Sequence, residues 1–232
     1  MVTAERRGGG EGVRGLYPFL YPGPGGTDAD AVAQAAASTR EKVAEIADLR
    51  RRVAALHATR IVECARDMAG RFTAGGRLFT FGNGGSSTDA QQVATTFLNP
   101  REGRPLPALC LTCDVAVVTA LSNDAGFEVV FARQIAALAR PGDIALGLST
   151  SGGSANMLGA FREARARGLL TVALAGYEGG QLAESSMDGV LDHLFIVPSS
   201  SVHRIQEAQT TVYHILWEAT QHALRDSTPI GT

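Results

Sequence analysis

The stretch FGNGGSSTDAQQVATTF, residues 81–97, places four small or polar residues directly after an apolar run. The run RLFTF ends at Phe81, and Gly82, Asn83, Gly84 and Gly85 follow it before a helical pattern begins near residue 86. Glycine allows the backbone to come close to a ligand, and the start of a helix offers free N–H groups with a partial positive charge. The stretch therefore predicts a strand, a ligand-binding loop and a helix, and the expected ligand is an anion, most often a phosphate.

A second loop has the same construction. The segment STSGGS, residues 149–154, follows the apolar run IALGL and precedes another helical pattern. Neither loop is a standard nucleotide-binding motif, because Ser87 stands where GxGxxG needs its third glycine and neither loop contains GK[ST]. A small phosphorylated ligand therefore fits better than a dinucleotide. The alternative interpretation is that Ser86, Ser149 and Ser154 only cap helices.

The rest of the chain after Gly76 alternates between strand-like and helix-like segments. Five apolar runs of strand length are present: RLFTF, ALCLT, IALGL, LTVAL and HLFIV. Helical patterns lie between or after most of them, at about residues 86–99, 114–121, 127–139, 154–167 and 202–225. Continuous apolar strands that alternate with helices indicate an α/β fold, a doubly wound parallel sheet covered by helices on both faces. Ligands of such sheets bind at the carboxyl ends of the strands, which is where both loops lie.

The N-terminal part has a different character. Residues 1–28 are rich in glycine and proline and predict a flexible tail. From there to Gly75 and Gly76, apolar residues recur every three or four positions, which predicts one or two long helices with an apolar stripe that needs a partner surface. We expect a single domain over residues 29–226 that includes these helices, residues 29–75, as an extension used for oligomerisation.

Composition excludes several classes of protein. The 232 residues are 45% hydrophobic and 19% charged, and the net charge of −2 gives no reason to expect nucleic-acid binding. No apolar run reaches the roughly 18 residues that span a membrane, and the N-terminus lacks the apolar core of a signal peptide, so we expect a cytoplasmic protein without a membrane partner. The pair Cys110 and Cys113 has redox spacing, but it falls in an apolar run, and we interpret both as small buried apolar residues.

Four segments resemble the sugar isomerase (SIS) domain family, and most closely its phosphoheptose isomerases. They are FGNGGSSTDAQ, LSNDAGFE, GDIALGLSTSGGSANML and RIQEAQTTVYHILWE, and they occur in the family's order and spacing over about residues 30–224. The resemblance implies a five-stranded parallel sheet and a homotetramer formed through the N-terminal helices. It also implies a heptose phosphate ligand, and the conversion of sedoheptulose 7-phosphate to D-glycero-D-manno-heptose 7-phosphate.

The resemblance also implies roles for individual residues. Phosphate binding falls to four residues of the second loop: Ser149, Thr150, Ser151 and Ser154. The sugar would contact Asn83, Gly84, Ser86 and Asp124. In the last helix Gln206 and His214 match the family's reactive pair. His203 stands where the family usually has an aspartate; it is a third catalytic candidate that could compensate for missing groups, and the alternative is a surface histidine at a helix start.

The chain departs from the family at two positions of the helix after the first loop. Aldose–ketose isomerisation needs a base for the carbon proton and an acid for the carbonyl oxygen. The resembling isomerases have a histidine and a glutamate one turn apart there, often with zinc, whereas this chain has Gln92 and Thr96. Only Gln206 and His214 then remain as weak zinc ligands, which disfavours zinc. Two interpretations stay open, a phosphoheptose-isomerase-type enzyme with weakened activity and a non-catalytic regulator that binds a sugar phosphate or a protein partner.

Overall fold

The computed structural model describes residues 28–226 and contains one five-stranded sheet. The strands are β1 (Leu78–Gly82), β2 (Ala108–Cys110), β3 (Ile144–Leu148), β4 (Leu170–Gly176) and β5 (His193–Val197). They lie in the order β2-β1-β3-β4-β5, and every neighbouring pair is parallel. All five carboxyl ends therefore meet at one edge, and both predicted loops leave the sheet at that edge.

The helices of the described chain are α2 (Asp28–Thr73), α3 (Gly85–Leu98), α4 (Val115–Asp124), α5 (Val130–Leu138), α6 (Ala155–Ala166), α7 (Gly180–Met187) and α8 (Val202–Asp226). A short 3-10 helix, η2 (Phe127–Val129), precedes α5. The chain divides into two compact units, and the boundary falls within α2, between residues 44 and 45. The described part of the first unit, residues 28–44, is helical, and Val32 and Val43 on it are 68% and 60% exposed.

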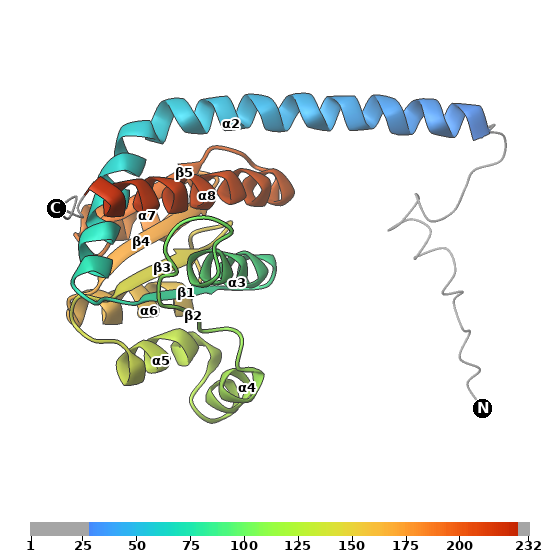
Figure 1. Cartoon of the computed structure of the whole chain (residues 1–232). Coiled ribbons are helices and arrows are strands. Elements are labelled where there is room, and N and C mark those ends of the chain that lie inside the picture. Colours follow the sequence, from blue (N-terminus) through green and yellow to red (C-terminus); the bar gives the residue numbers. More distant parts are fainter. Residues whose placement is uncertain (1–27, 227–232) are drawn as a thin grey trace, which may run out of the picture. The chain divides into compact units, whose positions relative to one another are not determined.

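Helices cover both faces of the sheet of the second unit (Figure 1), and a hydrophobic core lies on each face. On one face α3, α8 and the later part of α2 contribute Phe97, Tyr213 and Met68. On the other face α5, α6 and α7 contribute residues such as Phe131, Phe161 and Leu182. Because both faces are covered, strands β1, β3 and β4 are buried along their whole length, which explains why their sequences are continuous apolar runs and do not alternate.

The predicted fold class is confirmed, with local differences. The apolar runs IALGL and HLFIV match β3 and β5 residue for residue, and the predicted N-terminal helices form one continuous helix that ends at Thr73. Helix α7 was not predicted, because GQLAESSM begins with glycine and holds few apolar residues. Cys110 is buried as predicted, but Cys113 is exposed and free, so the interpretation of Cys113 as a buried residue was wrong. The predicted tail falls almost wholly outside the described residues.

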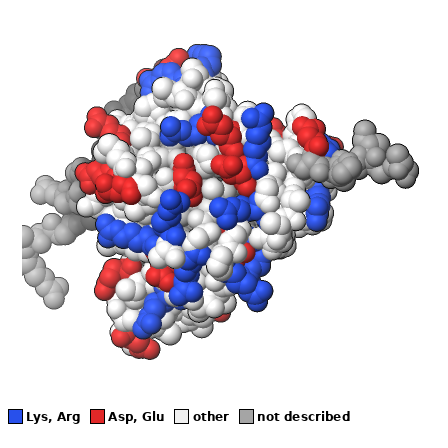
Figure 2. Space-filling model, turned by 90° about the vertical axis from the view of Figure 1, so that its left-hand side faces the viewer, with Lys and Arg blue, Asp and Glu red and all other residues white. Residues whose placement is uncertain are grey.

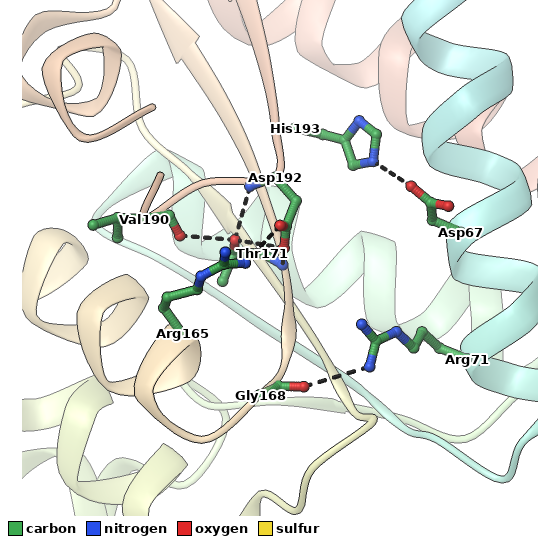
Figure 3. A network of polar contacts seen from close by, with 8 residues as sticks. All are labelled: Asp67, Arg71, Arg165, Gly168, Thr171, Val190, Asp192 and His193. Carbon is green, nitrogen blue, oxygen red and sulfur yellow. Dashed lines mark hydrogen bonds and ion pairs between the residues drawn. The ribbon is translucent and has the colours of Figure 1, made fainter. Parts of the chain in front are cut away.

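Polar contacts hold together the amino ends of β4 and β5, at the edge of the sheet opposite the two loops (Figure 3). Asp192 accepts hydrogen bonds from the backbone N–H and the hydroxyl of Thr171, at 2.9 and 3.0 Å, and pairs with Arg165 at 2.7 Å. The imidazole Nε2 of His193 contacts the Asp67 carboxylate at 2.8 Å, which ties α2 to β5. These contacts satisfy backbone and side-chain groups that the first residues of the strands would otherwise leave unpaired.

The surface carries charges of both signs. On the face in Figure 2, basic and acidic side chains are interspersed, and no broad basic area dominates the described residues drawn there. This pattern agrees with the small net charge of the chain. Within residues 28–226, no helix combines the length and the apolar character that crossing a membrane requires.

Candidate functional site

The first loop joins β1 to α3 and is connected to the start of α6 by a pair of amides. The Asn83 side chain donates to the Asn156 side chain on α6 at 2.9 Å, and the Asn156 amide donates back at the same distance. Ser86, the second residue of α3, is buried. The first loop is therefore fixed to the start of α6, the helix that follows the second loop, by side-chain hydrogen bonds as well as by the sheet.

The second loop joins β3 to α6 and is held in place from several sides. The backbone N–H of Gly152 donates to the Ser149 hydroxyl at 2.9 Å, and Gly176 at the end of β4 donates to the Thr150 carbonyl at 3.0 Å. Leu182 of α7 donates its N–H to the Gly152 carbonyl at 3.0 Å. The loop therefore has a defined shape in the free protein, which lowers the ordering cost of binding a ligand.

Gly152 is required at its position for two reasons. Its φ of +69° is a conformation that side-chain-bearing residues rarely adopt, and a Cβ there would overlap the backbone carbonyl of Gly179. The close approach packs the second loop directly against the loop between β4 and α7. The neighbouring Gly153 has open space around its Cβ position and no such constraint.

Hydroxyl groups of the second loop remain available to a ligand. Ser154 is the N-cap residue of α6, but its side chain makes no capping hydrogen bond. Ser151 is exposed and has only a 3.5 Å contact to the N–H of Gly153. These hydroxyls surround the amino end of α6, where free N–H groups favour an anion. The alternative that the serines merely cap helices accounts poorly for Ser154, and it does not account for Ser86 inside α3.

Helix α8 contacts both loops through two glutamines three residues apart. The Gln206 amide donates to the Asp89 carboxylate on α3 at 3.1 Å, and the Gln209 amide donates to the Ser149 carbonyl at 3.0 Å. Gln209 is fully buried, and its carbonyl oxygen Oε1 has no partner among the described residues. A Cβ on Gly85 would overlap the end of the Gln206 side chain, so Gln206 lies directly against the first loop.

His214 lies two turns further along α8 and is partly buried. Its Nδ1 lies 2.8 Å from the Thr210 carbonyl, and its ring packs beside the Tyr213 ring. A carbonyl oxygen only accepts hydrogen bonds, so Nδ1 carries the proton of the neutral ring and Nε2 keeps its lone pair. His214 is thus oriented so that Nε2 is the nitrogen free for proton transfer.

Asp89 belongs to this site, although the sequence analysis did not select it. It is half-buried, and burial raises the pKa of its carboxyl, an effect that the hydrogen bond from Gln206 partly offsets. The sequence spacing could have indicated this residue. Asp89, Gln92 and Thr96 are separated by three and four residues, so they share one face of α3. We overlooked it because a polar residue near a helix start is usually a capping or solvent-exposed residue.

Gln92 and Thr96 interact mainly with each other. The Gln92 amide lies 3.4 Å from the Thr96 hydroxyl, which itself donates to the Gln92 carbonyl at 2.8 Å. Across residues 28–226 no three His, Cys, Asp or Glu side chains are grouped so that they could hold a metal ion. Gln92 and Thr96 offer an amide and a hydroxyl, whereas zinc prefers four N, S or carboxylate ligands.

Two predicted site residues are exposed and take no part in the polar contacts described above. His203 is exposed at the second position of α8. Asp124 is exposed at the end of α4, where its carboxylate accepts from the Asn123 amide at 2.7 Å. The predicted residues of the two loops leave adjacent strands at one edge of the sheet, with Gln206 against Gly85 and His214 further along the same helix; the loop residues are Asn83, Gly84, Ser86, Ser149, Thr150, Ser151 and Ser154.

Comparison with known proteins agrees with this geometry. Residues 43–176 match the family model of the SIS domain. The chain is 44% identical over 179 residues to a phosphoheptose isomerase of Roseiflexus sp., an alignment covering 76% of this chain and 88% of the relative. It is 40% identical over 179 residues to that of Aquifex aeolicus, covering 76% and 91%. The solved phosphoheptose isomerase structure from Neisseria gonorrhoeae superposes with a TM-score of 0.73 at 32% identity, covering 80% of this chain and 97% of that one.

The packing of the second loop yields a matched pair of substitutions. We expect Gly152→Ala to destabilise the folded protein by about 1–3 kcal/mol, the usual cost of a strained backbone position, and to weaken the binding of sugar phosphates. Gly153→Ala adds the same methyl group in open space. It should therefore leave both properties nearly unchanged. Thermal unfolding and titration calorimetry measure the two effects, and equal behaviour of the two variants would contradict the described loop.

Proposed function

We propose that this chain, which belongs to the phosphoheptose isomerase family of SIS-domain proteins, interconverts a seven-carbon ketose phosphate and its aldose phosphate. The relatives are named phosphoheptose isomerases. For this chain we propose the same reaction, the conversion of sedoheptulose 7-phosphate to D-glycero-D-manno-heptose 7-phosphate.

The observation that carries the proposal is the position of α8. This helix holds the start of the second loop through Gln209 and approaches the first loop through Gln206, while His214 offers its Nε2. A phosphate bound by the open hydroxyls of Ser151 and Ser154 at the start of α6 would anchor one end of the sugar. The other end would then extend along the first loop towards the polar residues of α3 and α8.

We further propose that the protein works without a resident zinc ion. The support is the replacement of the family's histidine and glutamate by Gln92 and Thr96, whose side chains are directed to each other. Without those two groups, acid–base chemistry depends on side chains that remain in the site. We expect slow turnover, because one positioned acid or base contributes about 10²–10⁴-fold to a rate.

Product analysis tests the function directly. Purified protein is incubated with sedoheptulose 7-phosphate, with added zinc in one sample and with a chelator in another, and the aldose product is followed by NMR. We expect slow formation of the aldose phosphate at the same rate in both samples. Binding of the sugar phosphate without any product would instead favour the non-catalytic regulator. A rate that depends strictly on zinc would contradict the metal-free proposal.

Restoring the family residues is a second prediction. In the double variant Gln92→His with Thr96→Glu, the new side chains stand at i and i+4 on one helix face, so both can act on one ligand. We expect higher zinc affinity and faster turnover than in the wild type. Each single substitution serves as a control and should have a smaller effect on zinc binding. If the double variant binds sugar phosphate normally but gains neither zinc nor rate, the site has been rebuilt for a different arrangement of reactive groups.

We also propose that the chain forms a homotetramer through α2. The support is the exposed apolar side chains of this helix, Val32, Val43, Leu56 and Val62. Light scattering should give four times the chain mass of 24.3 kDa. Val32 and Val43 are about three turns apart and share one face, so replacing both with glutamate should lower the measured mass. Glu41→Gln, an exposed change on the same helix, is the control, and a monomeric wild type would overturn the proposal.

A further inference from the structure

We propose that Asp89 is the residue that moves the carbon-bound proton in this chain, in place of the glutamate that Thr96 replaces. This inference rests on the proposed isomerase function and deepens it. It assigns the missing base to a side chain already present in the site and supported by its own contacts.

The position of Asp89 is the first argument. It lies on α3 between the first loop and Gln92, on the helix face that also carries Thr96. Its carboxylate accepts from the Gln206 amide, and Gln206 lies against Gly85 of the first loop. Asp89 is therefore in contact with a residue that the loop geometry places in the site.

The other carboxylates close to the sequence motifs are engaged or directed elsewhere. Glu207 forms an ion pair with Arg204, which also pairs with Glu45. Glu128 and Asp124 are exposed, the first in η2 and the second at the end of α4. In the described part of the chain, Asp89 is thus the carboxylate that combines partial burial with a direct contact to Gln206.

The surroundings of Asp89 leave its carboxylate without a paired cation among the described contacts. Burial raises the pKa of the Asp89 carboxyl above the usual range of an aspartate. A more basic carboxylate is a better acceptor for a carbon-bound proton. The groups facing it are the neutral Gln206 amide and the neighbouring Tyr213, whose own pKa is raised by burial and by the Asp89 charge. The described contacts thus place no cation beside Asp89 that would lower its basicity.

The proton transfers balance with Asp89 and His214 acting together. The Asp89 carboxylate takes the proton from the carbon beside the carbonyl, the released C–H electrons form the C=C bond of an enediolate, and the former carbonyl oxygen carries the negative charge. The Nε2 of neutral His214 takes the proton of the neighbouring hydroxyl and passes it to that oxygen, and a carbonyl forms at the carbon that carried the hydroxyl. The Asp89 carboxylic acid returns its proton to the neighbouring carbon, so both residues end as they began.

Asp89→Asn separates this role from a structural one. The amide oxygen of the new side chain still accepts the hydrogen bond from Gln206, but the side chain no longer ionises. We expect kcat to fall by about 100-fold or more. KM and the affinity for inorganic phosphate should stay within about threefold of the wild type. Asp89→Glu, which keeps a carboxylate, should retain more activity than Asp89→Asn, and the exposed Asp188→Asn should behave as the wild type.

Two pH-dependent measurements complete the test. The acid limb of the wild-type rate should lie above the ordinary range of an aspartate and should be absent from the residual rate of Asp89→Asn. In the folded state the raised pKa favours the protonated carboxyl, so ionisation at neutral pH lowers stability. Asp89→Asn should therefore melt at a higher temperature than the wild type at neutral pH, and the difference should shrink as the pH falls through the raised pKa.

The outcomes are distinguishable from failure of the proposed function. An active wild type with an equally active Asp89→Asn variant overturns this inference and leaves the isomerase function intact. A variant that loses phosphate affinity and thermal stability together with activity shows that Asp89 is structural, which also overturns it. A wild type that forms no aldose phosphate overturns both proposals at once.

Discussion

The close approach of α8 to the carboxyl edge of the sheet is the constraint on which the candidate site depends. Gln206 and Gln209 are three residues apart and therefore share one face of the helix, so a single rigid element contacts both loops. A side chain at position 85 would displace the end of Gln206, so this glycine allows the amide to lie against the first loop. Any movement of α8 would thus disturb its contact with the second loop and its contact with α3 at the same time.

The two loops are stabilised by different means, and this difference matches their proposed tasks. The second loop is held by backbone hydrogen bonds from β4 and α7 and by the packing of Gly152 against Gly179, which leaves its outer hydroxyls free. The first loop is held by side chains, through the Asn83–Asn156 amide pair and the contact of Gly85 with Gln206. A rigid backbone suits the binding of a phosphate, whereas ionisable and amide side chains suit the handling of protons.

Much of the fold could be predicted from the sequence, because burial of the strands determines their pattern of apolar residues. Strands buried on both faces appear as continuous apolar runs, and IALGL and HLFIV coincide with β3 and β5. Helix α7 was not predicted because it is short, begins at Gly180 directly after Gly179, and buries only Leu182 and Ser185. The loops were identified from their glycines and hydroxyls. Asp89 was not, because its importance arises from Gln206, a residue 117 positions away that the chain brings into contact only on folding.

The replacement of the family's histidine and glutamate also alters the surroundings of Asp89. An imidazole at position 92 would stand one helical turn from Asp89, close enough to share its proton or pair with its charge. The Gln92 side chain is neutral, so it can neither share that proton nor pair with that charge as a cation. Its amide lies instead against Thr96. With that neighbour neutral, the basicity of Asp89 is governed by burial and by one hydrogen bond from Gln206. In the proposed site, the neutral residues at positions 92 and 96 therefore leave a partly buried carboxylate that no cation of residues 28–226 is seen to pair with, and this favours its role as the base.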